Sequence, residues 1–383
     1  MENVLLTIEK KIWESIDNEE RIGLFNGLSG VALFYDYLFL HDNREEYKEK
    51  LIILLDKINT IIAEELSSVS LNSGLAGFGL TLLKLKNDFV SIDDSYFTDI
   101  DAILKEELEE EANNSNYDYL NGSLGIAMYF LERYKKDKNI GTTAILNNYI
   151  GKFISKINTD LLLILRKPTL NEGHCYYFGM AHGVASFINF LLYAKLHFTD
   201  LSHQIDEPLK NCIAFLHFHK YKNDNSKQLY PNVFLIEENK FINPLLSWCQ
   251  GDLGIANALY NAGVFLNEDR IIKEAQELIE NTCTISLEES GIADYSFCHG
   301  TIGILIQYHL ASIKFKNDYS EVSEKWKEIL VKQTNNFLTF ENFEQKEKTQ
   351  ETNLLYGLTG LGLGLLSIDK KINTDWLEIV NLH

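Results

Sequence analysis

Residues 300–310 read Gly-Thr-Ile-Gly-Ile-Leu-Ile-Gln-Tyr-His-Leu, and the beginning of this stretch recurs along the whole chain. Two glycines three residues apart, here called a GxxG motif, lead into small and apolar residues at six places, and a seventh motif has serine as its second member. The first glycines of the seven motifs are Gly27, Gly74, Gly122, Gly183, Gly251, Gly300 and Gly357. They lie 47 to 68 residues apart, which is room for two helices of average length with their connections.

The segments that follow the motifs differ in character from the segments between them. Residues 31–40 and 255–265 are almost continuously apolar, and a helix that is apolar all round is a buried one. Residues 45–65, 95–111 and 267–282 carry charges at helical spacing, which predicts amphipathic surface helices. This alternation predicts an all-α fold, an α/α toroid in which seven outer helices surround seven inner ones. We expect the paired glycines to let neighbouring inner helices approach closely.

One interval departs from the repeat. Residues 199–245 contain a polar stretch, 222–227, followed by the β-branched and aromatic residues 230–236. This composition predicts an insertion loop with a short strand. We expect the chain, residues 1–383, to form a single toroid domain that carries this insertion.

Composition excludes several classes of protein. The 383 residues are 45% hydrophobic and 23% charged, which is typical of a folded globular protein, and 4 prolines fit a helical one. The net charge of −20 has the wrong sign for binding nucleic acid. The first residues do not resemble a signal peptide, and no apolar run is long enough to span a bilayer, so we expect a cytoplasmic protein that does not cross the membrane. Five cysteines are too few, and odd in number, for a disulfide framework.

Five polar residues fall just before a GxxG motif. They are Asp118, four residues before the first glycine, His182 and His299, one before, and Cys249 and Cys298, two before. Equivalent positions in a toroid converge at one end, so we expect these side chains to gather there. Two thiolates and an imidazole are typical zinc ligands, and three protein ligands leave a fourth position open. The alternative is that both cysteines are small buried hydrophobes and His299 is a hydrogen-bonded polar group; the shared position before the motifs favours the metal.

Other candidates carry less weight. Cys212 and Cys283 lie in amphipathic segments away from the motifs, which indicates core packing. His174 and Cys175 precede His182 closely enough to reach the same end of the toroid, and Asp294 precedes Cys298 by four residues, although solvation explains it equally well. A nucleophile elbow and a phosphate-binding loop are both absent from the sequence, which disfavours common hydrolase and nucleotide-binding functions.

At these residues the chain resembles the lanthionine synthetase cyclases, the LanC family, over nearly its full length. The resemblance rests on Tyr117-Asp118 before Asn121-Gly122, on Ala181-His182-Gly183, on Trp248-Cys249 before Gly251 and on Cys298-His299-Gly300. It implies an α/α toroid with one zinc ion per chain held by Cys249, Cys298 and His299. It also implies formation of lanthionine and methyllanthionine thioether rings, by addition of cysteine thiols to dehydroalanine or dehydrobutyrine in a ribosomally made peptide.

The implied reaction assigns roles to two further residues. Adding a thiolate to the β-carbon places charge on the amide as an enolate, which then needs a proton at the α-carbon. His182 is the leading candidate for this acid because its ordinary pKa lies near 6.5, and Asp118 either orients it or takes the thiol proton. Two positions depart from the family pattern: Gln250 stands where the family commonly has tyrosine, and Leu245 where members often carry arginine. These departures bear on proton delivery and enolate stabilisation rather than on the metal site.

Two related functions remain as alternatives. One is addition of glutathione to dehydroamino acids, as the eukaryotic LanC-like proteins are thought to do, and the other is a non-catalytic scaffold that binds a peptide or a dehydratase. An unrelated carbohydrate enzyme of toroid fold is disfavoured, because such an enzyme needs acidic residues around the mouth and Asp118 is the main acidic residue at the positions just before the motifs. The expected partners are a dehydrated precursor peptide, a dehydratase and an exporter, and through such a complex the protein would associate with the membrane peripherally.

Overall fold

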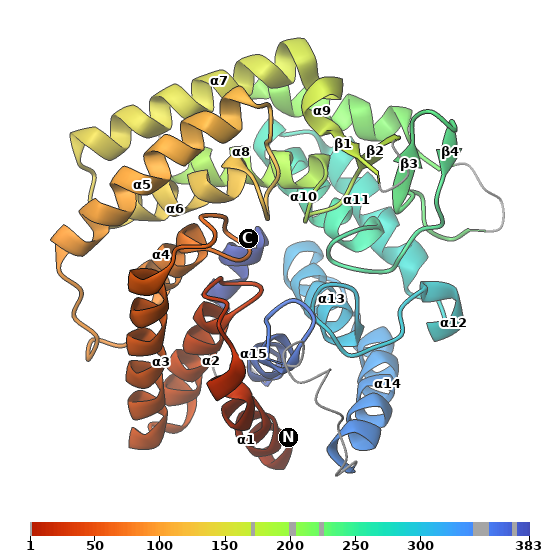
Figure 1. The fold of residues 1–383 in the computed structure, drawn as a ribbon. Helices are drawn as coiled ribbons and strands as arrows, with labels where there is room; N and C mark the ends of the chain where they lie inside the picture. The colour runs from red at the N-terminus through yellow and green to blue at the C-terminus, as the bar shows by residue number, and fades with distance from the viewer. Residues whose placement is uncertain (1, 170–172, 199–203, 222–225, 340–351, 370–373) are drawn as a thin grey trace.

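The computed structural model describes residues 2–169, 173–198, 204–221, 226–339, 352–369 and 374–383. Its helices form two concentric rings (Figure 1). In these residues the inner ring has seven helices, and each begins at the residue after the first glycine of a GxxG motif. They are α2 (Leu28–Asp42), α4 (Leu75–Lys84), α6 (Ser123–Lys136), α8 (Val184–His197), α10 (Asp252–Leu266), α13 (Thr301–Phe315) and α15 (Leu358–Ile368). Each contacts the next, and α15 contacts α2, which closes the ring.

The outer ring consists of amphipathic helices that each cover the inner ring with one face. Within the described chain these are α1 (Glu2–Ser15), α3 (Glu45–Glu64), α5 (Asp94–Asn113), α7 (Ile140–Leu165), α9 (Asp206–Phe218), α11 (Asp269–Thr282) and α14 (Ser320–Thr339). In α11, for example, Ile271, Ala275 and Leu278 are buried at helical spacing while charged residues occupy the other face. The predicted toroid is therefore confirmed. Short helices η1 (Ile16–Asn18), α12 (Leu287–Ser290) and η3 (Asp375–Val380) complete the helical content of the described chain.

The GxxG glycines fit each inner helix to the loop that precedes it. A Cβ on the second glycine would lie within 2.7 Å of the carbonyl oxygen six residues earlier, as at Gly30 with Leu24 or Gly303 with Phe297. The same loops are closed by backbone hydrogen bonds, for example from Leu28 N–H to the Arg21 carbonyl at 2.9 Å. The expected contact between neighbouring inner helices is made largely by later glycines: Gly79 faces Tyr129, and Gly362 faces Phe34. The motif thus builds tight helix starts at one end of the ring, which we call the mouth.

The interval that departs from the repeat contributes part of a small antiparallel sheet. Its strands, in order, are β1 (Arg166–Pro168), β2 (His174–Tyr177), β3 (Val233–Leu235) and β4 (Lys240–Phe241). The predicted strand at 230–236 corresponds to β3. The interval 199–245 is more than an insertion, because it also contains the outer helix α9. Residues 199–203 and 222–225, which include much of the predicted polar stretch, lie outside the described residues.

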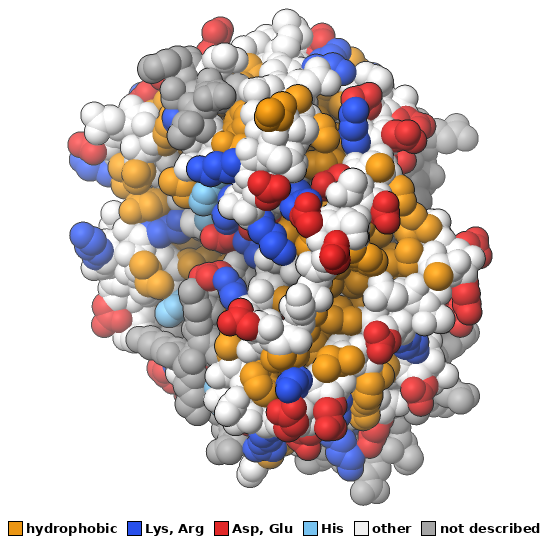
Figure 2. Space-filling view, turned by 90° about the vertical axis from the view of Figure 1, so that its left-hand side faces the viewer, with side chains coloured by type: hydrophobic (Ala, Val, Ile, Leu, Met, Phe, Trp, Pro, Cys, Tyr) orange, Lys and Arg blue, Asp and Glu red, His pale blue; other side chains and the backbone are white. Residues whose placement is uncertain are grey.

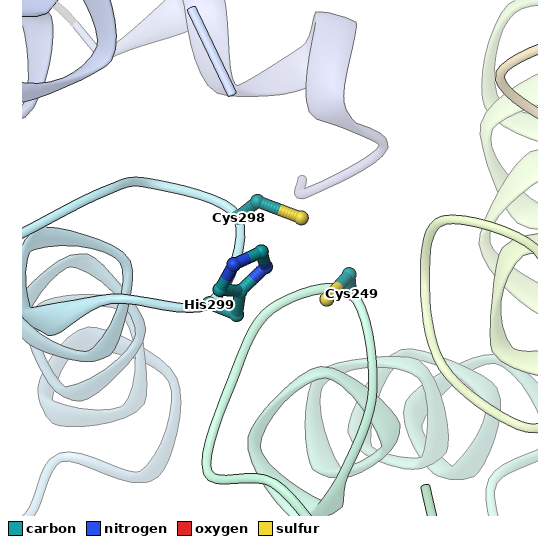
Figure 3. A group of neighbouring side chains, drawn as sticks. All are labelled: Cys249, Cys298 and His299. Carbon is teal, nitrogen blue, oxygen red and sulfur yellow. The ribbon is translucent and has the colours of Figure 1, made fainter. Parts of the chain in front are cut away.

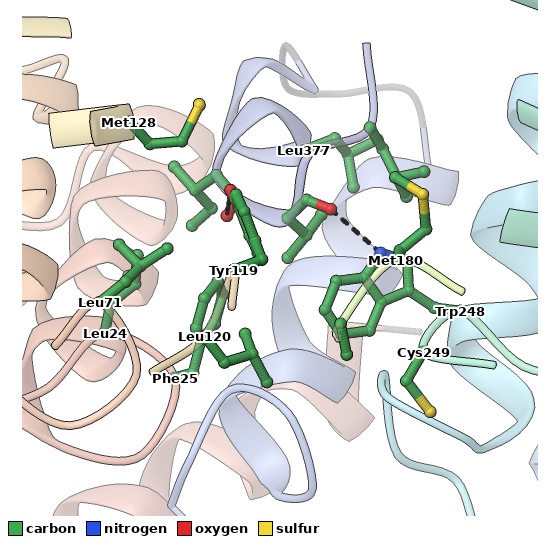
Figure 4. Close-up of a cluster of buried hydrophobic side chains, with 14 of the residues drawn as sticks. Leu24, Phe25, Leu71, Tyr119, Leu120, Met128, Met180, Trp248, Cys249 and Leu377 are labelled. Atoms are coloured by element: carbon green, nitrogen blue, oxygen red, sulfur yellow. Dashed lines mark hydrogen bonds between the residues drawn. The ribbon is translucent and has the colours of Figure 1, made fainter. Parts of the chain in front are cut away.

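The C-terminal segment 374–383 occupies the centre of the toroid (Figure 1). Its apolar side chains are buried, and its backbone accepts hydrogen bonds from the surrounding ring. Trp248 Nε1–H donates to the Val380 carbonyl at 3.0 Å, and the Tyr119 hydroxyl donates to the Ile379 carbonyl at 2.8 Å (Figure 4). The central channel is therefore closed by this segment behind the mouth.

The outer surface is mixed in character. On the face that includes α3 and α5, apolar side chains lie exposed among charged ones (Figure 2). Among them are Ile52, Ile53 and Ile103, each between 41% and 51% exposed. No helix in the described part of the chain combines the length and the apolar character needed to cross a bilayer.

Candidate metal centre

Cys249, Cys298 and His299 converge at the mouth from two neighbouring loops (Figure 3). One atom from each side chain can act as a metal ligand, and these atoms lie within 4.8 Å of one another. Cys249 ends the loop before α10, and the other two end the loop before α13. The two loops are joined by a backbone hydrogen bond from Cys249 N–H to the Cys298 carbonyl at 3.2 Å. The tight helix starts of the GxxG motifs therefore place the three side chains together.

The electrostatics of the cluster favour a thiolate at Cys249. A hydrogen bond from Cys298 lowers the pKa of Cys249 well below its ordinary value against the effect of burial, and hydrogen bonds from His299 and Ser247 lower it further. Burial and the bond to Cys249 raise the pKa of Cys298. These contacts favour the deprotonated form of Cys249, the form in which a cysteine binds a metal cation.

The donor set and its surroundings fit zinc. Two sulfurs and an imidazole nitrogen are soft and borderline ligands of the kind that zinc prefers over oxygen-rich sets. Both cysteines are buried, with 8% and 3% exposure, whereas His299 is only partly buried and neighbouring Tyr356 is 48% exposed. One side of the cluster therefore faces solvent, which leaves room for a fourth ligand.

Asp118 and His182 form a second polar group at the mouth. His182 Nδ1 lies 2.8 Å from Asp118 Oδ2, while Oδ1 of the same carboxylate accepts the backbone N–H groups of Leu120 and Asn121 at 3.0 and 2.9 Å. Burial alone would raise the pKa of Asp118, but the hydrogen bond and charge of His182, with the charge of Lys167, hold it at about 2. The pKa of His182 is raised: its burial opposes the charged form, but the Asp118 bond and charge outweigh this.

The two groups belong to adjacent loops. A Cβ on Gly179, in the loop that carries His182, would lie 2.1 Å from the Cys249 carbonyl oxygen. The negative charge of Cys249 also contributes to the raised pKa of His182. The structure thus brings all five residues singled out before the motifs to the same end of the ring.

The other sequence candidates lie apart from this group or shape its loops. Cys212 is fully buried in α9 and Cys283 follows α11, in agreement with core packing. His174 is partly exposed on β2 and faces Glu237 at 2.8 Å, away from the cluster. Asp294 accepts the Ser296 N–H at 2.8 Å, so it shapes the loop before α13.

The structure also shows the surroundings of Cys175 and of the two departures from the family pattern, Leu245 and Gln250. Cys175 is buried on β2 and exchanges a hydrogen bond with Tyr177. Leu245 packs its backbone carbonyl against Gly251, whose φ of 103° is accessible mainly to glycine. Gln250 is buried, and its Oε1 has no hydrogen-bond partner among the described residues.

Sequence reasoning missed four residues at the mouth: Ser247, Tyr356, Lys167 and Tyr177. Tyr356 stands directly before Gly357, the same position that drew attention to His182 and His299, and its ring centroid lies 5.3 Å from that of His299. The search for polar residues just before each GxxG motif could therefore have identified Tyr356. Ser247 Oγ lies 3.6 Å from Cys249 Sγ. Lys167 and Tyr177 come from the β1–β2 hairpin, so they do not stand at the positions just before a GxxG motif.

The fold and the site define an α/α toroid with a cysteine–histidine cluster just before the N-terminal ends of two inner helices. The model of the family described as lanthionine synthetase C-like protein matches residues 19–380, and the chain belongs to this family. The nisin biosynthesis protein NisC of Lactococcus lactis subsp. lactis is 26% identical over 413 residues, covering 97% of this chain and 91% of that protein. The solved structure of a nisin cyclase matches with a TM-score of 0.77 and 21% identity, over 100% of this chain and 98% of the other.

Proposed function

We propose that the protein is a zinc-dependent lanthipeptide cyclase that forms thioether rings in a dehydrated peptide. The observation that carries this proposal is the partly open cluster of Cys249, Cys298 and His299 beside the Asp118–His182 pair. Membership of the lanthionine synthetase C-like family and likeness to a protein of nisin biosynthesis support it.

The cluster and the pair supply complementary chemistry. Zinc held by the three side chains would bind the substrate cysteine and stabilise it as a thiolate, the nucleophilic form. The sulfur electron pair forms a bond to the β-carbon of dehydroalanine or dehydrobutyrine, and the π electrons of the alkene move onto the amide as an enolate. The thiol proton is released to solvent and His182 adds a proton at the α-carbon, so the ring-forming step does not change the mass of the peptide.

In this proposal His182 delivers the proton. Its Nδ1 faces Asp118, so Nε2 is left to carry the proton to the α-carbon. Asp118 fixes the ring orientation through Oδ2, while its other oxygen is held by two backbone amides. This division of work makes His182 the acid and Asp118 its positioning group.

The expected partners follow from this function. A cyclase of this kind needs a precursor peptide that a dehydratase has already converted, and an exporter would remove the product. Such a complex would hold the protein at the membrane periphery in the cytoplasm.

Zinc content and cyclisation together test the proposal. We expect about one zinc ion per chain by elemental analysis, lost in Cys298→Ala and retained in His182→Ala and in the control Cys283→Ala. With a dehydrated peptide, alkylation of remaining thiols followed by mass spectrometry should show ring formation by the parent protein and Cys283→Ala. His182→Ala should be at least 100-fold slower, as for loss of a general acid.

The same assay distinguishes the alternatives. Thiol loss with glutathione but not within the peptide would identify the glutathione-adding activity. Peptide binding without loss of thiol, in zinc-loaded protein, would identify a scaffold and contradict the proposal.

A further inference from the structure

The β1–β2 hairpin presents one of its faces to the Asp118–His182 pair. In the antiparallel register Lys167 stands opposite Cys175, and Tyr177 lies two residues further along the same strand. Paired and alternate residues share a face of a sheet, so Lys167, Cys175 and Tyr177 point the same way. Arg166, the neighbour of Lys167, points to the opposite face, where it approaches His174 and Glu237.

Lys167 contacts the pair directly. Its Nζ lies 3.5 Å from Asp118 Oδ2, the same oxygen that binds His182, and donates to Asn116 Oδ1 at 3.2 Å. The Lys167 side chain is 17% exposed and the Asp118 side chain 8%, so solvent screens this ion pair only partly. Asp118 is therefore held from four directions: two backbone amides, an imidazole and an ammonium group.

The Lys167 ammonium group affects how readily His182, in the Asp118–His182 pair, releases a proton. The charged and titratable groups that face His182 are Asp118, Lys167 and Cys249, with the ring of Tyr177 at a centroid distance of 5.6 Å. The Asp118 carboxylate favours the imidazolium form of His182. Lys167 offsets part of that attraction and acts to lower the pKa of His182, so the imidazolium can release its proton more readily.

We propose that Lys167 is a positioning residue of this site, whose ammonium group holds the Asp118 carboxylate in place and thereby orients His182. Its catalytic consequence rests on the proposed cyclase function, whereas its effect on His182 does not. The spacing of residues relative to the GxxG motifs does not predict this role, because Lys167 reaches the mouth through the pairing of β1 with β2.

The test removes the charge and follows His182 directly. Lys167→Met and Lys167→Gln remove the ammonium group, Lys167→Arg keeps a cation, and Arg166→Met is the control on the opposite face. The Cε1–H signal of His182, assigned by its absence in His182→Asn, is titrated by NMR in zinc-containing protein. We expect the titration midpoint to move to higher pH in both charge-removing variants, and to stay near the parent value in Lys167→Arg and Arg166→Met.

Kinetics provide the second readout. With dehydrated peptide, Lys167→Met should lower kcat roughly tenfold at unchanged KM and unchanged zinc content, and Lys167→Arg should recover most of the loss. A His182 titration in Lys167→Met and Lys167→Gln that superimposes on that of the parent overturns the proposal. If the midpoint moves but the parent protein forms no rings, the role of Lys167 stands and the cyclase function is wrong.

Discussion

Asp118 is the residue on which the polar part of the mouth depends. One carboxylate oxygen fixes the loop before α6 through the amides of Leu120 and Asn121, and the other binds His182 and Lys167. The same side chain therefore shapes the backbone and orients a candidate acid. A neutral side chain of equal size keeps some of the backbone contacts and loses the charge.

The ion pair with His182 predicts a pH-dependent contribution to stability. The pKa of His182 is raised in the folded protein. His182 therefore contributes fully to stability at pH values below its ordinary pKa of 6.5, and this contribution is lost as pH rises through the raised pKa. The pKa of Asp118 is lowered to about 2, so its contribution is present above the ordinary value of 3.8 and is lost as pH falls toward 2. The pair therefore stabilises the fold most between those two ordinary values.

We expect Asp118→Asn to lower the free energy of unfolding more at pH 5.5 than at pH 9, by roughly 1 kcal/mol in metal-free protein. Urea unfolding at the two pH values measures this difference. Asp160→Asn is the matched control, because Asp160 pairs with Lys156 on the surface, at 3.1 Å, and lysine stays charged at both pH values. An equal loss at both pH values for Asp118→Asn would contradict the assigned ion pair.

At the scale of the element, the GxxG motif determines where each inner helix starts. Its first glycine caps the helix, and its second leaves space for a carbonyl oxygen of the preceding loop. The loops so formed carry the candidate site residues, so helix starts and site geometry depend on the same glycines.

Gly30 offers a direct test of this packing, with Gly151 as the control. A Cβ at Gly30 would lie 2.3 Å from the Leu24 carbonyl oxygen, whereas a Cβ at Gly151 in α7 meets nothing within 4 Å. We expect Gly30→Ala to destabilise the protein by about 1–3 kcal/mol through overpacking. Gly151→Ala should stabilise it by about 0.5–1 kcal/mol through helix propensity. Thermal or urea unfolding measures both, and the opposite order of stabilities would disprove the role given to the motif.

At the scale of the whole molecule, the segment 374–383 ties the ring together from its centre. Glu378 forms ion pairs with Lys84 of α4 and, at 3.4 Å, with Lys135 of α6. Trp248, which precedes the candidate ligand Cys249, donates to the carbonyl of Val380. The candidate metal centre is thus supported from behind by a segment more than a hundred residues later in the chain.

Trp376 is the largest apolar group of this segment, and its loss should be costly. It is fully buried, its ring centroid lies 5.4 Å from that of Phe297, and its Nε1–H donates to Ser367 Oγ at 2.8 Å. We expect Trp376→Ala to cost about 3–5 kcal/mol of stability, measured by urea unfolding. Phe218→Ala, at a side chain that is 84% exposed, should change stability by about 0.5 kcal/mol or less. Similar effects of the two substitutions would show that the segment does not fill a packed centre.

The toroid and the cluster of Cys249, Cys298 and His299 could be predicted from residue spacing. A repeat along the chain becomes a rotation about the axis of the ring, so residues at equivalent positions before the motifs meet at the mouth, however far apart they are in sequence. Apolar and amphipathic segments alternate in the same repeat, which separates inner from outer helices. Both features are local patterns repeated often enough to exclude chance.

The position of Lys167, the contact of Tyr177 with His182 and the central place of residues 374–383 could not be predicted in this way. Lys167 reaches Asp118 because β1 pairs with β2, and β2 pairs with β3 nearly sixty residues later. The C-terminal segment takes its hydrogen bonds from Trp248 and Tyr119, which lie on separate parts of the ring and far from it in sequence. Spacing along the chain carries no information about such contacts, because their energies depend on surfaces that exist only in the folded molecule.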